Sequence, residues 1–473
     1  MKMKTGKEHL TKEWLNLPED QIYLRFLIRW IETAKEKIWG EELPVPVSPE
    51  GRTGASFLLY QRLCTLAGTA LDALWQKKLA GKNPLTRMDL RLARKDERRQ
   101  AAVELLKELE EMDGSLLWAE APLLSGQLDR CMNQFCIVFR EMLERIGTDR
   151  EEIYRSFFDG EDFGTITGWN TQMADLHFHG RSTVRVDTEK GRFFYKPRDC
   201  RTDVLFGKIV ERWFFDITRV LHCILRPGYV FCQNMEPLQV STEAEAEQYF
   251  WNLGGFCALF QMMGASDLHS ENLIIQGVYP VLVDMETVLT PQPEEFSDPE
   301  IFPEPPARKQ DFVYDLNLSL YPSSILPKFD GGRQFSILLD KRSETHQLPV
   351  IDGKKRTVLE FQDSFLDGFS QIYDRCICCR EELMAVFHEF EQVPVRRLLR
   401  QSAYYGRVLE ALQNPAALRS EESRRKITGW LNQYFQEHGA EHLLSIVLAE
   451  ENSLLESGTA VPGPSVLRKP CRS

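Results

Sequence analysis

Residues 267–287 read DLHSENLIIQGVYPVLVDMET, and this stretch decides which fold the rest of the sequence is expected to adopt. Asp267, His269 and Asn272 stand first, and two short apolar runs separated by a glycine turn follow them. The second run ends at Asp284. The runs predict a β-hairpin, which brings its two ends, Asn272 and Asp284, to one edge. The interval from Asp267 to Asn272 is the D-x-x-x-x-N spacing of kinase catalytic loops.

These residue types suit phosphoryl transfer. A carboxylate such as Asp267 can orient an attacking hydroxyl and accept its proton, while Asn272 and Asp284 offer hard oxygen atoms that hold Mg²⁺ on phosphates. Upstream, residues 182–187 and 192–196 predict two strands joined by a tight turn. Lys196 therefore ends a strand, as a phosphate-pairing lysine does in kinases, although a lysine at a strand end is ordinarily solvated.

Around the hairpin, apolar residues recur at three- and four-residue steps, which predicts helices. The clearest are Gln21–Trp39, Gly54–Lys78, Arg98–Glu111, Gln127–Arg145, Asp203–Phe215, Phe361–Phe387 and Val395–Ala411. A capping box at Thr242 and Glu245 begins another helix, and a further strand is expected at Tyr229–Gln233. The order of these elements predicts an α+β, kinase-like, two-lobed core with helical additions at both ends. We expect an N-terminal helical cap or activation region (1–160), a kinase-like N-lobe with the catalytic loop (161–290) and a helical C-lobe (291–473).

Composition excludes several classes of protein. The 473 residues are 43% hydrophobic and 27% charged, so the chain is neither disordered nor fibrous. A net charge of −12 disfavours a nucleic-acid partner. The first residues lack an apolar signal region and no run is long enough to span a bilayer, so a cytoplasmic protein is expected. The 11 cysteines show no spacing framework, and Cys376, Cys378 and Cys379 are expected to be reduced thiols on a helix.

Two further clusters could bind phosphate. In the first, residues 175–181 read DLHFHGR: Gly180 lets a backbone approach a phosphate and Arg181 can pair with one. A plain turn and a structural His177 are the alternative readings. In the second, residues 395–405 read VRRLLRQSAYY, and Arg396 and Arg400 share one helical face. Together they could grip a phosphate, whereas the alternative is a solvated basic face.

In combination these motifs resemble the dehydratase part of class II lanthipeptide synthetases (the LanM type), over most of the chain from about residue 50 to about residue 460. The motifs that carry the resemblance are Asp175-x-His177-x-x-Gly180-Arg181, Tyr195-Lys196-Pro197-Arg198, Asp267-x-His269-x-x-Asn272, Asp284-x-Glu286-Thr287 and Arg396-x-x-x-Arg400-x-Ser402-x-Tyr404-Tyr405. The most diagnostic pair of motifs is Tyr195-Lys196-Pro197-Arg198 together with Asp284-x-Glu286-Thr287.

The resemblance implies a lipid-kinase-like core that binds ATP and Mg²⁺, phosphorylates Ser and Thr in a precursor peptide and then eliminates the phosphate. It assigns Lys196 to the nucleotide phosphates, Asp267 to the substrate hydroxyl, and Asn272 and Asp284 to the metal. The further residues that it places at the site are Asp175, His177, His269 and, on the cofactor side, Gly180, Arg181, Arg198 and Glu286. It gives Arg396, Arg400 and Ser402 to the elimination step.

The chain departs from the family's pattern in three ways. Ser402 stands where the family has Thr, and the hydroxyl is retained. The interval from Asp284 to Arg396 is shorter than is usual in the family. The usual C-terminal cyclase domain with its zinc site is not expected, so no zinc is predicted and the partners would be a precursor peptide and a separate cyclase. Two other functions remain open: a phosphotransferase without elimination, because the motif at Asp267 also resembles aminoglycoside and choline kinases, and a non-catalytic kinase-like subunit that binds peptides.

Overall fold

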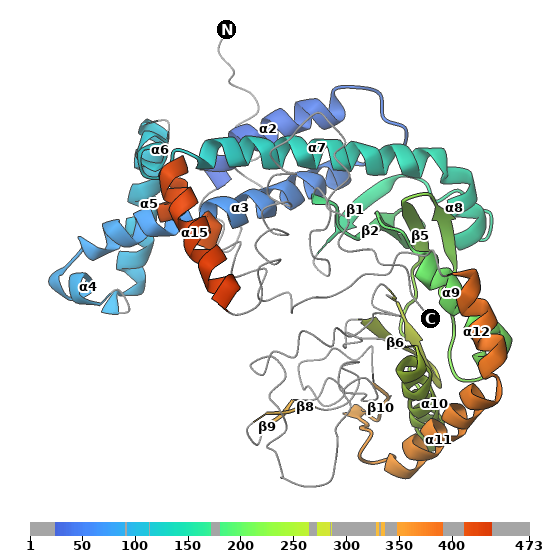
Figure 1. Ribbon diagram of the computed structural model, residues 1–473. Coiled ribbons are helices and arrows are strands. Elements are labelled where there is room, and N and C mark those ends of the chain that lie inside the picture. Colours follow the sequence, from blue (N-terminus) through green and yellow to red (C-terminus); the bar gives the residue numbers. More distant parts are fainter. Residues whose placement is uncertain are drawn as a thin grey trace.

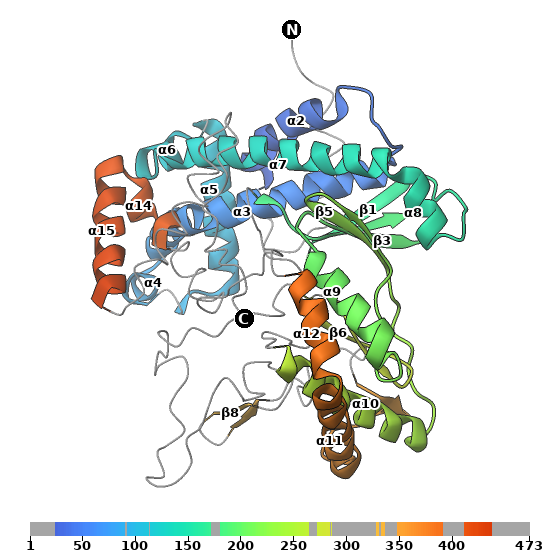
Figure 2. The same cartoon turned by 45° about the vertical axis from the view of Figure 1, so that its right-hand side comes forward.

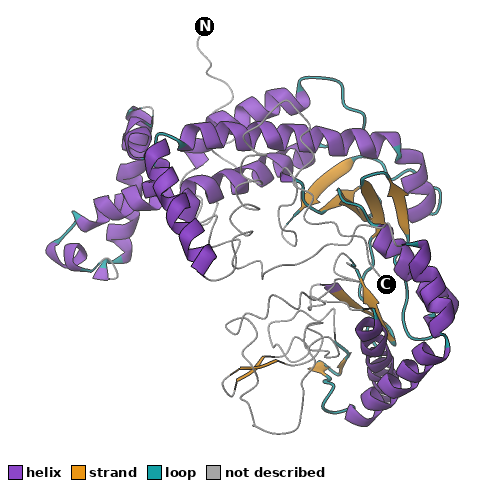
Figure 3. Cartoon of the chain, viewed as in Figure 1, coloured by secondary structure: helices purple, strands orange, loops and turns teal. Residues whose placement is uncertain are grey.

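The computed structural model describes residues 24–89, 92–112, 114–171, 180–263, 272–283, 285, 328–330, 333–335, 348–390 and 411–437. These residues form a mixed α+β structure that is mostly helical and contains a five-stranded antiparallel sheet. Figure 1 shows the long N-terminal helices above the sheet and a second group of helices below it. Figure 3 shows the same arrangement by secondary structure.

The N-terminal region is helical, as the apolar periodicity predicted. Its helices are α2 (Leu24–Trp39), α3 (Pro49–Ala80), α4 (Pro84–Met88), α5 (Lys95–Glu111), α6 (Ser115–Glu120), α7 (Leu124–Thr148) and α8 (Arg150–Phe157). Ser48 begins α3 as its N-cap, because its hydroxyl accepts a hydrogen bond from the Gly51 amide at 3.1 Å. The buried faces of α2, α3 and α7 supply most of the first hydrophobic core.

The sheet has the strand order β1-β2-β3-β5-β4. Its strands are β1 (Ile166–Asn170), β2 (Val184–Thr188), β3 (Arg192–Lys196), β4 (Cys223–Arg226) and β5 (Tyr229–Gln233). The predicted hairpin of β2 and β3 is present, with Val184 opposite Tyr195, and β5 pairs with β3 so that Lys196 lies opposite Val230. One face of the sheet packs into the first core, so the helical region and the sheet share a single apolar interior.

The second core lies on the other side of the sheet. It is formed chiefly by α9 (Arg201–Ile209), the π-helix η4 (Val210–Phe214), α10 (Glu243–Met262), α11 (Gln362–Cys378) and α12 (Arg380–Glu389), with the hairpin of β6 (Leu273–Gln276) and β7 (Tyr279–Leu282). The predicted capping box of α10 is present. The remaining strands are short: β8 (Lys328–Asp330), β9 (Arg333–Phe335), β10 (Val350–Ile351) and β11 (Lys354–Lys355).

Two predicted helices differ from the structure. The helix expected at Asp203–Phe215 changes into a π-helix after Ile209, where each turn takes an extra residue. The helix expected at Phe361–Phe387 is two helices, because Cys379 adopts φ −100° and ψ 22° between them. This break turns α12 toward α9, and Lys208 donates to Glu389 at 2.9 Å across that contact.

The end of the described chain returns to the N-terminal helices. Helices α14 (Pro415–Leu418) and α15 (Glu421–Glu437) lie beside α5 and α6 in Figure 2. Leu418 is fully buried in the first core, and its carbonyl accepts a hydrogen bond from the Leu123 amide at 3.1 Å. Arg419 forms an ion pair with Glu120 at 3.5 Å. Val395–Ala411, expected to be helical, lies outside the described residues except for its last residue.

Candidate functional site

Lys196 is the last residue of β3, and it is buried although it carries a charge. Only 5% of the residue is exposed, and its ammonium Nζ donates a hydrogen bond to the carbonyl oxygen of Val283 at 2.5 Å. Because side chains alternate along a strand, Tyr195 packs into the first core while Lys196 points to the opposite face of the sheet. The lysine therefore connects the sheet to the end of the β6–β7 hairpin.

Val283 also contacts the other end of that hairpin. Its amide donates to the carbonyl oxygen of Asn272 at 2.9 Å, directly beyond the cross-strand pair of Leu273 and Leu282. Helix α10 also contacts the hairpin. Its Asn252 is fully buried, and Nδ2 of this residue donates to the Val278 carbonyl at 2.7 Å. Lys196 therefore bonds to the carbonyl of Val283, and Asn272 bonds to its amide.

We predicted that Lys196, Asn272 and Asp284 converge. The structure links Lys196 and Asn272 through Val283, the residue immediately before Asp284. Four other predicted site positions fall outside the described residues, namely Asp267, His269, Asp284 and Glu286. Their roles stay predictions. The two backbone hydrogen bonds of Val283 bring the Lys196 ammonium to the hairpin end at which Asn272 stands. An ammonium suits nucleotide phosphates, and the side-chain oxygen of Asn272 suits a hard cation such as Mg²⁺.

Gly180 and Arg181 lead into the sheet from the first predicted phosphate cluster. Gly180 has φ +74°, a left-handed conformation that favours glycine. Its carbonyl accepts a hydrogen bond from Arg62 of α3 at 2.9 Å, and burial lowers the pKa of that guanidinium. Arg181 forms an ion pair with Glu141 of α7 at 2.6 Å. Asp175 and His177, together with His179, lie outside the described residues.

Arg198 lies two residues beyond Lys196, at the start of α9. Its Nη1 lies 3.5 Å from a carboxylate oxygen of Asp203, and Asp203 is in the first turn of that helix. Arg198 also donates to the Asp199 carbonyl at 3.4 Å. Both side chains of the ion pair are largely buried, so Arg198 connects the end of the sheet to α9. Its predicted contact with a cofactor stays a prediction.

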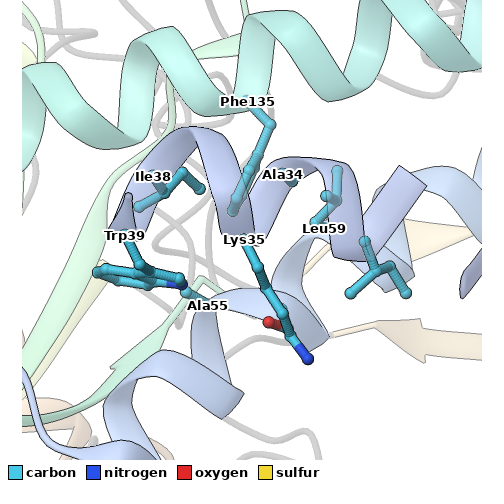
Figure 4. A pocket seen from close by; sticks show the side chains of 9 residues that line it. Ala34, Lys35, Ile38, Trp39, Ala55, Leu59 and Phe135 are labelled. Atoms are coloured by element: carbon cyan, nitrogen blue, oxygen red, sulfur yellow. The ribbon is translucent and has the colours of Figure 1, made fainter. Parts of the chain in front are cut away.

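The residues predicted for elimination, Arg396, Arg400 and Ser402, lie outside the described residues. Within the described part of the chain, no three His, Cys, Asp or Glu side chains are placed to hold a metal ion. A pocket between α2, α3 and α7 is lined mainly by apolar side chains, including Ile38, Leu59 and Phe135 (Figure 4). None of the predicted site residues that the structure describes lines it.

The cysteines in the described ranges are free thiols. Cys376 and Cys378 lie on α11, as expected, whereas Cys379 lies at the break between α11 and α12. Burial raises the pKa of Cys376 to about 12 and that of Cys131 to about 11, whereas Cys378 is exposed.

We therefore expect iodoacetamide at about pH 8 to alkylate Cys378 at least about tenfold faster than Cys376, because the thiolate is the reactive form. Both cysteines lie in the tryptic peptide 376–380, so fragmentation of this peptide by tandem mass spectrometry over time measures the two rates. Urea should make the rates similar. Equal rates in the native protein would contradict the packing of α11.

The sequence interpretation missed a polar cluster on α7. Glu141 and Arg145, four residues apart, form an ion pair on one face of this helix, and Arg145 donates to the hydroxyl of Tyr195 at 2.6 Å. Burial raises the pKa of Tyr195 although Arg145 opposes this effect. The signal in the sequence was a charged pair at i, i+4 spacing, but such pairs are usually solvated.

Comparison with known proteins gives a distant relative. The lacticin 481/lactococcin biosynthesis protein of Lactococcus lactis subsp. lactis is 24% identical over 140 residues, which are 27% of this chain and 15% of that protein. The match therefore spans a small part of the relative. Within the described ranges, we find no helix with the length and apolar character needed to cross a bilayer.

A family described as "Domain of unknown function (DUF4135)" matches residues 122–340 and 337–458. These two ranges cover more than half of the chain. They contain α7, the sheet, the β6–β7 hairpin and every predicted site residue from Asp175 to Ser402. The chain therefore belongs to the DUF4135 family.

Proposed function

We propose that the protein transfers a phosphoryl group from ATP to Ser and Thr side chains of a precursor peptide and then eliminates the phosphate. The products would be dehydroalanine and dehydrobutyrine. The observation that carries this proposal is the hydrogen-bonded link from Lys196 through Val283 to Asn272. The motif sequence around it and the similarity to a lacticin 481/lactococcin biosynthesis protein support a peptide as the substrate.

In the first step, the hydroxyl oxygen of Ser or Thr would form a bond to the γ-phosphorus while the bond from that phosphorus to the ADP oxygen breaks. Asp267 would accept the hydroxyl proton. Lys196 would bind the nucleotide phosphates, and its burial favours this role because a charge is felt more strongly away from water. Asn272 and Asp284 would hold Mg²⁺, which would neutralise charge on the phosphates.

In the second step, a basic side chain of the site would take the α-proton of the phosphorylated residue, and the electron pair of that C–H bond would form the Cα–Cβ double bond. The bond from Cβ to the phosphate oxygen would break, and phosphate would leave with its electron pair. Phosphorylation is needed because a free hydroxyl is a poor leaving group. Arg396 and Arg400 would stabilise the departing phosphate by donating N–H groups to its oxygens. Ser402 would act beside them. Asp175, His177, His269 and Glu286 would line the same site.

The test is to mix the protein with Mg·ATP and the Ser/Thr-containing precursor peptide encoded beside its gene, and to weigh the peptide. We expect each modified residue to lose the mass of one water. Arg396→Ala should stall at the phosphopeptide, because it removes a donor to the leaving group. The matched control, Arg397→Ala, changes the adjacent arginine, which falls on another face of the helix that the sequence predicts for residues 395–411, and should leave dehydration intact.

A second function, phosphoryl transfer without elimination, is favoured by one observation: the motif from Asp267 to Asn272 also resembles that of aminoglycoside and choline kinases, which do not eliminate phosphate. In that case the wild-type peptide gains the mass of phosphate and loses no water, and Arg396→Ala changes little. A protein that fails to bind Mg·ATP in a calorimeter would contradict both functions and would indicate a non-catalytic peptide-binding subunit.

A further inference from the structure

We propose that Glu141 of α7 is a positioning residue for Lys196, acting through Arg145 and Tyr195. The inference rests on the proposed function, in which Lys196 binds the nucleotide phosphates. It assigns a role to the N-terminal helices, because α7 lies across the sheet from the face that presents the lysine (Figure 1).

The contacts form a continuous path. Glu141 forms ion pairs with Arg145, one turn along α7, and with Arg181 at 2.6 Å. Arg145 in turn donates to the Tyr195 hydroxyl at 2.6 Å, and its guanidinium lies 4.4 Å from the centre of the Tyr229 ring. Tyr195 and Tyr229 belong to the neighbouring strands β3 and β5. Arg145 therefore contacts both β3 and β5.

Because side chains alternate along β3, fixing Tyr195 on one face of the sheet also fixes Lys196 on the opposite face. Tyr195 and Lys196 are consecutive, so their side chains project from opposite sides of β3. Tyr195 is 2% exposed and cannot shift without displacing its neighbours in the first core. With Tyr195 held by Arg145, the backbone of β3 is held as well, and Lys196 keeps its direction toward Val283.

Glu141 carries the negative charge in the cluster that it forms with Arg145 and Arg181, so the position of Arg145 depends on it most. The side chains of Glu141, Arg145 and Arg181 are 22%, 24% and 25% exposed, so water screens them only in part. Glu141 contacts both arginines and offsets one of their two positive charges. Without its charge, the two guanidinium groups lose this shared counter-ion in a partly buried site, which disfavours the position that Arg145 needs to reach Tyr195.

An ordinary structural role, in which the cluster only attaches α7 to the sheet, predicts a different result. It predicts that changes in Glu141 lower stability and leave the environment of Lys196 unchanged in the folded protein. A positioning role predicts that the environment of Lys196 changes while the protein stays folded. Measurements on the folded protein at Lys196 itself therefore separate the two roles.

The experiment compares Glu141→Gln with the matched control Glu144→Gln, which makes the same change at an exposed position of the same helix. Acylation of Lys196 by acetic anhydride is followed by peptide mass mapping, and Mg·ATP affinity is measured by calorimetry. For Glu141→Gln we expect faster acylation of Lys196 and about tenfold weaker Mg·ATP binding, as for the loss of one charge-assisted hydrogen bond. Glu144→Gln should match wild type in both.

Tyr195→Phe keeps the ring and removes only the hydroxyl that Arg145 contacts. We expect it to weaken Mg·ATP binding like Glu141→Gln, and the double variant to be no weaker than either single variant, because both break the same path. Glu141→Asp, which restores the charge, should recover much of the affinity. Additive effects, or an acylation rate of Lys196 that Glu141→Gln leaves unchanged, would overturn the proposal.

The two proposals fail in different ways. If the wild-type protein does not bind Mg·ATP, the proposed function is contradicted, and the acylation rates still decide whether Glu141 positions Lys196. If wild type binds Mg·ATP and the Glu141→Gln protein binds it equally well, the function stands and the positioning role falls.

Discussion

Replacing Lys196 with methionine is expected to reduce phosphoryl transfer at least about 100-fold, the loss typical of removing one preorganised donor from a charged transition state. Methionine has a similar length and no charge, so the variant keeps the volume of the side chain and loses the hydrogen bond to Val283. Formation of phosphopeptide or dehydrated peptide from Mg·ATP, followed by mass spectrometry, measures the loss.

The same substitution should change stability little, because two effects oppose each other. Lys196 is 5% exposed, so methionine removes the cost of burying a charge, but it also leaves the Val283 carbonyl without this hydrogen bond. Lys190→Met is the matched control, because Lys190 pairs with Glu161 in an exposed turn before β3. A Lys196→Met protein that transfers phosphate at the wild-type rate would contradict the assignment of this lysine.

Alanine at Gly254 of α10 or Gly368 of α11 should destabilise the fold by about 3 kcal/mol, at the upper end of the usual cost of overpacking. A Cβ on Gly254 would lie well inside van der Waals contact with the Phe365 carbonyl and 3.0 Å from the Phe369 amide nitrogen. A Cβ on Gly368 would meet the backbone of Trp251 in the same way. The two helices touch through their backbones, so neither can accept a methyl group without moving apart.

The substitutions at Gly254 and Gly368 should also change the candidate site. Helix α10 holds the β6–β7 hairpin through Asn252, so separating α10 from α11 should also loosen the hairpin that carries Asn272 and Val283. Thermal unfolding, followed by circular dichroism, measures the stability, and hydrogen exchange in residues 272–283 measures the hairpin.

Gly429→Ala provides the control of opposite sign. Gly429 is an exposed residue inside α15 with no atom within 4 Å of an added Cβ, so alanine there should stabilise the helix by about 0.5–1 kcal/mol. A Gly254→Ala protein whose melting temperature equals or exceeds that of wild type would contradict the close contact of α10 and α11.

Much of the local structure followed from the sequence, because its causes are local. The apolar spacing in α2, α3, α5 and α7 indicated helices, and the turn before Arg192 indicated the β2–β3 hairpin. The capping box of Thr242 and Glu245 placed the start of α10. The break at Cys379 was missed, because it depends on the packing of α12 against α9 and leaves the apolar spacing on both sides intact.

The sequence alone determined which residues could do chemistry: an ordered set from Lys196 to Asp284 in which each side chain suits phosphates or a hard cation. Only the tertiary structure decided that Lys196 is buried and meets Val283, 87 residues later in the chain. It also placed Glu141 and Arg145 beside Tyr195 of this strand, although charged pairs at this spacing on a helix are usually solvated. The physical reason is that spacing along a chain records local geometry, whereas burial and charge pairing depend on which distant surfaces fold against one another.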